Sequence, residues 1–296
     1  MQTESDEAIL LEQARSGSRT AFDHLAARLR PGLRSFIYRM VTQPEDAEDL
    51  VQETLLRAYR GLPSFRGESA FRTWMFTIAH RLCLDRLQER RRWPWTAQLE
   101  AEKFAKSRPE EVELIHGSMR TPGFRYEVRE HIAFCLACVG RSLPPEQHAA
   151  LLLSEMFAFK DREGAEILGL TEPTFRHRLQ AARQEMVKTF DGLCALVNKQ
   201  GACYQCNVLR DATPRPRRGE PVRPIGKDSQ TAAERLQVRL QIAQDAQLDT
   251  GKSRLMHEVI FRLMSRMFDG DATRTGPPPL ADAPIPEGQD AAIEAD

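Results

Sequence analysis

Apolar residues recur at intervals of three and four along most of the first 190 residues, which is the pattern of amphipathic helices. One such helix is predicted from Thr20 to Val41, and Pro31 inside it predicts a kink or a break. The next begins at Pro44 and ends at Gly61 and Pro63. A third carries an apolar stripe formed by Phe71, Trp74, Met75, Ile78, Ala79 and Leu82. With an N-terminal helix, this pattern predicts four helices between residues 6 and 92.

The helical pattern is lost between residues 93 and 124, where Trp93-Pro94-Trp95, Pro109 and Pro122 interrupt it. This segment is predicted to be a linker with one short helix. The pattern resumes near Tyr126 and continues to about Phe190.

The C-terminal third alternates between low-complexity and helical segments. Residues 211–230 are rich in proline and basic residues, as in an extended linker. Two helices are predicted at 231–248 and 254–268, and the apolar stripe of the second needs a partner surface. Residues 271–296 hold five prolines and six acids against one base, which predicts a disordered acidic tail.

The predicted fold class is therefore all-α: two small helical domains joined by a flexible linker, the second a helix-turn-helix, followed by a helical C-terminal extension and a disordered acidic tail. The predicted segments are a first domain at 1–95, a linker at 96–127, a helix-turn-helix domain at 128–190, a cysteine segment at 191–210, a second linker at 211–230, a helical extension at 231–270 and the tail at 271–296.

The helix-turn-helix is predicted from the stretch between Leu143 and Val187. A short helix at 161–168 ends at Gly169, which can adopt a left-handed cap, and Thr171 can cap the helix that follows. The second helix of such a motif enters the major groove. Its candidate DNA-contacting residues are Thr174, Arg176, His177, Arg178, Gln180 and Arg183. A solvated helix hairpin without a DNA role is the alternative. Gly164 is expected to weaken the short helix by roughly 1 kcal/mol relative to Ala.

Two neighbouring helices of the first domain have opposite charge. Residues 45–53 carry five acids and no base, which suits a basic protein surface, although a merely solvated face has the same composition. Residues 72–92 carry six Arg against two acids and could follow a phosphate backbone. Aromatic side chains nearby could stack on the bases of an opened strand. Phe65 and Arg66, in the loop before this helix, are better candidates than Phe71 and Trp74, whose apolar stripe favours core packing.

Composition narrows the function further. Lys plus Arg and Asp plus Glu are both 42, so the net charge is zero and the chain is not a free-standing basic nucleic-acid coat. Acids occupy the N-terminus, where a signal peptide would carry bases, and no apolar run reaches 18 residues, so we expect a cytoplasmic protein. The chain shows no phosphate-binding glycine loop, no G-x-S-x-G and no H-E-x-x-H, so no enzyme activity and no catalytic residues are expected.

Several stretches together resemble bacterial sigma factors of the extracytoplasmic-function (ECF) type. Residues 46–54 (DAEDLVQET) are similar to the polymerase-binding helix of that family, and residues 65–74 (FRGESAFRTW) to its promoter-melting segment. Residues 143–146 (LPPE) and 167–171 (ILGLT) resemble the start and the turn of its upstream-element reader. The resemblance covers about residues 8–190. It implies a subunit that directs core RNA polymerase to promoters and initiates transcription.

The resemblance also implies site residues and partners. The clamp helices of the polymerase largest subunit would contact Asp46, Asp49, Gln52, Glu53 and Arg57. The minus-ten promoter element would contact Ser64, Phe65, Arg66, Glu68, Ser69, Arg72, Trp74, Arg81 and Arg86, and the helix-turn-helix would read the minus-thirty-five element. Core RNA polymerase and promoter DNA are the implied partners, with an anti-sigma factor as a third. The alternative function is a metal- or redox-sensing helix-turn-helix regulator that does not dock on polymerase and has no need of the acidic helix.

The six cysteines raise a separate question. His131, Cys135 and Cys138 fall on one helix face, and Cys194, Cys203 and Cys206 form a second group. Thiolates and imidazoles in such groups suit tetrahedral zinc, and oxidation could release them. The first group also resembles the H-x-x-x-C-x-x-C segment of zinc-binding anti-sigma factors, while its apolar neighbours favour a buried helix face instead. Cys83 is predicted to lie in the core, and no other cofactor is expected.

Overall fold

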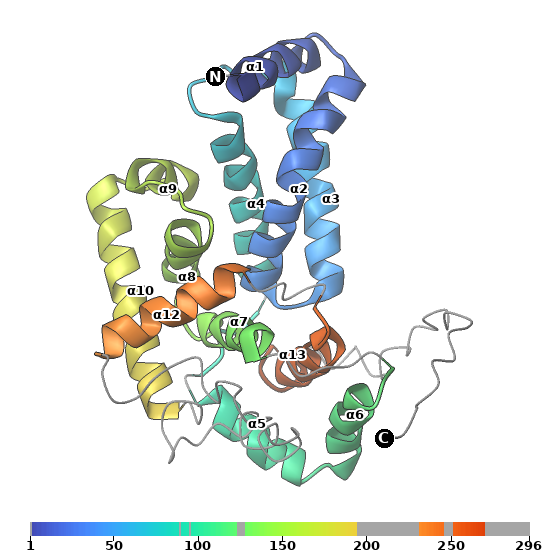
Figure 1. Cartoon of the computed structure of the whole chain (residues 1–296), viewed down its shortest axis with the longest axis vertical. Coiled ribbons are helices and arrows are strands. Elements are labelled where there is room, and N and C mark those ends of the chain that lie inside the picture. The colour runs from blue at the N-terminus through green and yellow to red at the C-terminus, as the bar shows by residue number, and fades with distance from the viewer. Residues whose placement is uncertain are drawn as a thin grey trace, which may run out of the picture.

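The computed structural model describes residues 2–88, 90–94, 96–122, 128–193, 231–245 and 251–269. Throughout these ranges the regular secondary structure is helical (Figure 1). No helix within them is long and apolar enough to cross a membrane.

The first four helices form one bundle. They are α1 (Gln2–Arg15), α2 (Arg19–Val41), α3 (Pro44–Gly61) and α4 (Phe71–Gln88), with a 3-10 turn at Leu62–Ser64. Ser18 caps α2 by accepting a hydrogen bond from the backbone N–H of Ala21. Leu33, Phe36, Val51, Met75 and Cys83 are fully buried between the helices. The prediction that Cys83 lies in the core is confirmed.

Of the kink or break expected at Pro31, the break is wrong, because α2 is continuous from Arg19 to Val41. A proline removes one hydrogen bond from the helix ladder. Both halves of α2 bury apolar side chains against the same bundle, including Leu25 before the proline and Ile37 after it. This burial outweighs one lost hydrogen bond.

The segment after the first bundle contains two helices rather than one, α5 (Ala97–Lys106) and α6 (Pro109–Met119). Pro109 had indicated an interruption, but it occupies the first turn of α6. A proline is favoured there, since the first N–H groups of a helix have no partner within it.

The second domain consists of α7 (Val128–Gly140), α8 (Pro145–Leu151), a π-helical turn (Leu152–Met156), α9 (Asp161–Leu168) and α10 (Glu172–Leu193). Gly169 ends α9 in the left-handed region with φ 65°. The backbone N–H of Thr174 donates to Oγ1 of Thr171 at 3.4 Å. Phe175 and Met186 of α10 are fully buried. The predicted turn chemistry and inward stripe of the helix-turn-helix are confirmed.

Gly164 lies where the two helices of this motif approach each other closely. A Cβ atom placed on it would lie 2.4 Å from Cζ of Phe175, closer than real side chains pack. The expectation that Ala would suit α9 better than Gly164 is therefore wrong. Glycine has a low helical propensity, but its missing side chain leaves room for Phe175 to pack closely against α9.

Replacing Gly164 with Ala is expected to destabilise the protein by about 1–3 kcal/mol, since overpacking displaces Phe175. Urea unfolding monitored by circular dichroism measures this change. Gly117→Ala in α6 is the matched control, because a Cβ there meets nothing within 4 Å. The control should be neutral or stabilising. Equal stability of Gly164→Ala and the unchanged chain would contradict the packing argument.

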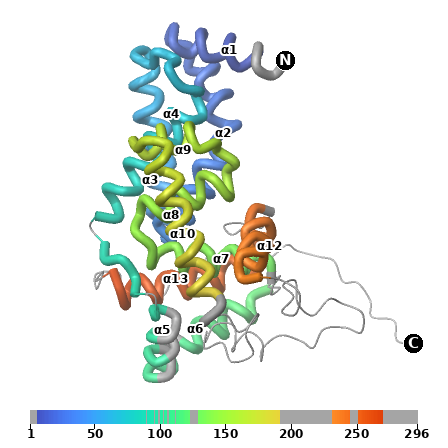
Figure 2. The backbone as a smooth tube through the Cα atoms, turned by 90° about the vertical axis from the view of Figure 1, so that its left-hand side faces the viewer, coloured from blue at the N-terminus to red at the C-terminus, as the bar shows by residue number. Residues whose placement is uncertain are grey.

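The C-terminal extension contributes α12 (Ala232–Asp245) and α13 (Arg254–Phe268). Helix α12 lies against α7, α10 and the π-helical turn, and α13 lies against α5, α6 and α7 (Figures 1 and 2). The apolar stripe predicted for residues 254–268 thus finds its partner surface within the same chain. Met256, Phe261 and Met264 are fully buried there.

Candidate functional site

Helix α3 presents an acidic surface to solvent. Asp49 and Gln52 are exposed, and Glu53 is partly exposed with its Oε1 2.7 Å from Nε of Arg57. The side chain of Asp49 forms no hydrogen bond or ion pair with any described residue. Proline and acids begin α3, where the helix dipole favours negative charge. This surface has the charge and the exposure needed to bind a basic partner surface.

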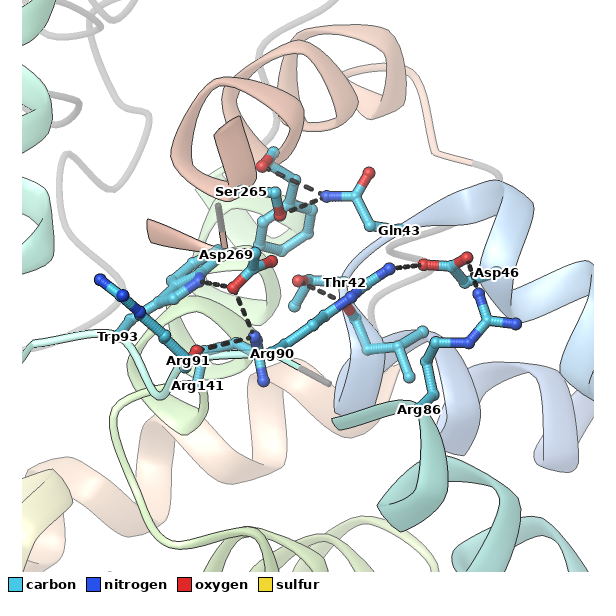
Figure 3. A network of polar contacts seen from close by, with 12 residues as sticks. Thr42, Gln43, Asp46, Arg86, Arg90, Arg91, Trp93, Arg141, Ser265 and Asp269 are labelled. Carbon is cyan, nitrogen blue, oxygen red and sulfur yellow. Dashed lines mark hydrogen bonds and ion pairs between the residues drawn. The ribbon is translucent and has the colours of Figure 1, made fainter. Parts of the chain in front are cut away.

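Asp46 does not belong to that surface. Its side chain is 4 % exposed and forms ion pairs with Arg86 and Arg90, which lie at and beyond the end of α4 (Figure 3). The prediction of an outward acidic face at Asp46 is corrected, because two guanidinium groups compensate a buried carboxylate there. Arg86 is correspondingly occupied within the chain rather than directed to a partner.

Two other acids of α3 also have intramolecular partners. Glu45 pairs with Arg262 of α13, and Glu48 pairs with Arg34 of α2. Both carboxylates keep more than a third of their side chains exposed. The part of the acidic surface that has no ion pair with another described helix is thus centred on Asp49, Gln52 and the Glu53–Arg57 pair.

The loop between α3 and α4 divides into a buried and an exposed part. Phe65 is 6 % exposed and packs on Trp74 and Phe71, with ring centroids 4.8 and 6.2 Å apart. The interpretation of Phe65 as an open stacking platform is corrected, since it anchors the loop to the bundle. Arg66 and Glu68 are exposed at the tip, and Gly67 has φ 73°.

The remaining loop residues frame this tip. Ser64 is exposed, and its hydroxyl donates to the carbonyl of Gly61 at 2.8 Å. Ser69 and Trp74 are half-buried. Polar side chains are therefore accessible around the loop, while its aromatic residues hold it in place.

The arginines of α4 lie in different environments. Arg81 is exposed. Arg72 lies over the ring of Phe159, 3.8 Å from its centroid, and donates to the carbonyl of Phe157 at 2.5 Å. Partial burial lowers the pKa of Arg72 from its usual value. In this arrangement Arg72 joins the two domains. Of the two arginines, only Arg81 is therefore open to a phosphate backbone.

The second helix of the helix-turn-helix, α10, directs a polar row to solvent. Arg176, His177 and Gln180 are exposed, and Nη1 of Arg176 lies 3.6–3.7 Å from carboxylate oxygens of Glu172 and Asp161. Arg183 pairs with the buried Glu155 of the π-helical turn. Thr174 and Arg178 are half-buried at the edge of the row. The structure therefore brings all six predicted residues onto one side of α10 or its edges.

The predicted metal ligands of α7 are buried. His131 is fully buried, and its Nε2 lies 3.5 Å from Sγ of Cys135, while Sγ of Cys138 contacts Sδ of Met264 at 3.6 Å. Nδ1 of His131 lies 3.4 Å from Nε2 of His257, so the two neighbours of His131 face different ring nitrogens. Among the described residues, no three His, Cys, Asp or Glu side chains are grouped to hold a metal ion. Cys194, Cys203 and Cys206 lie outside the described residues.

His257 is a buried polar residue that the sequence did not single out. Burial and the neighbouring His131 lower its pKa well below the usual value, so it is neutral near pH 7. Its ring stacks on Phe134 with centroids 4.6 Å apart. Its spacing of three and four residues from Ile260 and Phe261, both buried in α13, was the available signal for a core position.

The comparisons with known proteins find two family regions within this chain. The Sigma-70 region 2 family matches residues 25–92, and Sigma-70, region 4 matches residues 134–186. The ECF RNA polymerase sigma factor SigG of Mycobacterium tuberculosis is 33% identical over 167 residues, which cover 53% of this chain and 45% of SigG, so the chain spans about half the length of that relative. The RNA polymerase sigma-H factor of Pseudomonas aeruginosa is 28% identical over 198 residues, covering 65% of this chain and 98% of that protein.

A solved structure, CnrH in complex with the cytosolic domain of CnrY, has a TM-score of 0.46 and 22% identity, and the match covers 63% of this chain and 97% of that one. ECF RNA polymerase sigma factor SigM of Mycobacterium tuberculosis is 30% identical over 195 residues, which cover 66% of this chain and 90% of SigM. With both sigma regions matched in the same order, the chain belongs to the ECF family of RNA polymerase sigma factors.

Proposed function

We propose that this chain is a promoter-specificity subunit that directs core RNA polymerase to its promoters and initiates transcription there. The observation that carries this proposal is the pairing of an outward acidic surface on α3 with a polar, arginine-containing row on α10. The first suits a protein partner and the second suits the major groove. A regulator that bound DNA without polymerase would have no use for the first.

The proposed polymerase contacts are the outward residues Asp49, Gln52, Glu53 and Arg57 of α3. Asp46 instead has a structural role, because its ion pairs hold Arg86 and Arg90 against α3. Core RNA polymerase is the proposed partner of this surface, and an anti-sigma factor would compete for the same chain.

The proposed contacts to the minus-ten element are the accessible residues of the loop and of α4. They are Ser64, Arg66, Glu68, Ser69, Trp74 and Arg81, with Phe65 holding the loop from below. The proposed contacts to the minus-thirty-five element are Thr174, Arg176, His177, Arg178, Gln180 and Arg183. The chain itself carries out no chemical step in this function, and none of these contacts calls for a cofactor.

Run-off transcription with core polymerase and a library of promoter fragments tests the proposal. We expect transcripts from a subset of fragments that share two sequence elements, and none when the chain is left out. Absence of transcripts from every fragment, with a chain that remains folded, would overturn the proposed function.

A further inference from the structure

The C-terminal extension contacts the first domain through named polar and aromatic pairs. Nε2 of Gln43 donates to Oγ of Ser265 at 2.5 Å, and Glu45 pairs with Arg262 (Figure 3 shows the Gln43 contact). The ring of Tyr38 meets that of Phe261 edge-on, with centroids 6.0 Å apart. These residues of the first domain lie at the end of α2 and the start of α3, beside the proposed polymerase surface.

Helix α12 adds a further contact to the same domain. Nη2 of Arg39, a side chain that is almost completely buried, donates to the carbonyl of Ala243 at 3.1 Å. Burial lowers the pKa of Arg39 to about 10, still well above neutral pH, so a charged group is held under α12. A buried charge is costly unless it is hydrogen-bonded, so α12 is part of what stabilises Arg39.

The same two helices contact the second domain. Phe261 packs on Phe134 of α7 with centroids 4.5 Å apart, and Gln244 of α12 donates to the carbonyl of Glu155. At the start of α13, the carboxylate of Glu130 accepts hydrogen bonds from the backbone N–H groups of Lys252 and Ser253, at 3.0 and 2.8 Å. Phe261 therefore contacts one domain on each side.

A buried ion pair at the end of α13 also fastens it to Arg141, directly after α7. Oδ1 of Asp269 accepts hydrogen bonds from Nη2 of Arg141 and from Nε1 of Trp93, both at 2.9 Å (Figure 3). The side chains of Arg141 and Asp269 are 5 % and 2 % exposed. Removing one partner of such a pair leaves an uncompensated buried charge, which is strongly destabilising for the contact.

The two domains also meet directly. Helix α9 lies against α4 (Figure 1), and Phe157 and Phe159 pack on Phe76 with centroids 5.4 and 4.9 Å apart. The contact includes Arg72, whose guanidinium bonds to the carbonyl of Phe157. In this arrangement the minus-ten and minus-thirty-five readers form a single packed body.

This packed body does not fit the promoter that the proposed function requires. Elements centred at positions 10 and 35 are separated by about 25 base pairs, or roughly 85 Å of B-form duplex. Helix α10, with 22 residues, is only about 33 Å long. A chain in which α9 touches α4 cannot place α4 and α10 on both elements, so the domains must separate on the promoter.

We propose that α12 and α13 form an intramolecular clasp that holds the two domains together and keeps the free chain from engaging both promoter elements until polymerase separates the domains. This inference rests on the proposed function. Because the clasp contacts both domains at once, separation of the domains breaks its contacts with at least one of them. The free energy lost with those contacts then reduces the net free energy of binding to polymerase and promoter.

The test weakens the clasp without changing either domain. The triple variant Arg262→Ala, Ser265→Ala, Asp269→Asn removes its partners for Glu45, Gln43 and Arg141. Lys252→Ala is the matched control. Lys252 is exposed, and the contact described between it and Glu130 is made by its backbone N–H, which the substitution keeps. Thermal unfolding by circular dichroism establishes that each variant remains folded. If the triple variant does not fold, Ser265→Ala alone takes its place with the same readouts.

Two readouts are compared with the unchanged chain. Hydrogen exchange by mass spectrometry of the free protein should become faster in the facing segments 71–88 and 157–168, and run-off transcription at limiting chain should rise about fivefold or more. Unchanged exchange, or faster exchange without increased transcription, would overturn the clasp. Failure of the unchanged chain to transcribe any promoter would instead overturn the proposed function, while exchange alone would still report whether α12 and α13 hold the domains together.

Discussion

Transcription should fall about a hundredfold or more when Asp49 and Glu53 are both replaced by Lys. Both side chains reach solvent from the same helix, and the substitutions bring like charge against a basic partner surface. Such juxtaposition costs several kcal/mol, and each 1.4 kcal/mol is a tenfold change in binding. Titration of core polymerase with the labelled variant, followed by run-off transcription, measures both consequences.

The matched control is Glu12→Lys with Asp23→Lys, which makes the same change of net charge on α1 and α2. Both of these acids are exposed and, like Glu53, pair with an arginine three or four residues away. Exposed pairs of this kind contribute less than about 1 kcal/mol to stability, so neither variant should unfold. Equal loss of transcription in both variants would show that net charge matters rather than the α3 surface.

Replacing Arg176 with Ala should lower transcription from promoters bearing the upstream element about 5- to 150-fold. Arg176 is exposed in the first turns of α10, the part of a recognition helix that reaches base edges. A bidentate arginine–guanine contact contributes about 1–3 kcal/mol of discrimination. Run-off transcription on a library randomised in the upstream element measures this loss and the position at which base preference is relaxed.

Lys188→Ala is the control for this prediction, because Lys188 is an exposed base on the same helix about three turns farther from its start. Its removal should have little effect. A uniform loss across all upstream sequences for Arg176→Ala would mean that it contacts phosphate rather than a base. Identical behaviour of the two variants would contradict the assignment of Arg176 to the promoter.

The candidate site was predictable where local chemistry alone decides the geometry. The turn at Gly169 and Thr171 requires a left-handed residue and a capping hydroxyl, and both are recognisable from sequence. The exposure of Asp49, Gln52 and Arg81 follows from their place opposite an apolar stripe. The exposure of these candidate residues was therefore predictable without a structure.

Prediction was wrong where a side chain of a neighbouring element changes the surroundings of a residue. Asp46 stands between the acids Glu45 and Glu48 in the sequence of α3, yet it is buried and paired with Arg86 and Arg90. Phe65 lies in a polar loop, but Trp74 and Phe71 cover its ring. Gly164 suggested a weak helix, but the ring of Phe175 occupies the space that a side chain at position 164 would need. In each case the deciding atom belongs to another helix.

Local sequence signals were enough to predict the all-helical class, the order of the two sigma regions and the bounds of α3 and α13, because helical periodicity, caps and prolines act over a few residues. The packing of the whole chain was needed to learn that α13 lies against its own chain and that Arg72, Trp93 and Asp269 make contacts between segments. An apolar stripe specifies that a helix must be covered but not by what. That choice depends on side chains more than a hundred residues apart, whose proximity no local pattern encodes.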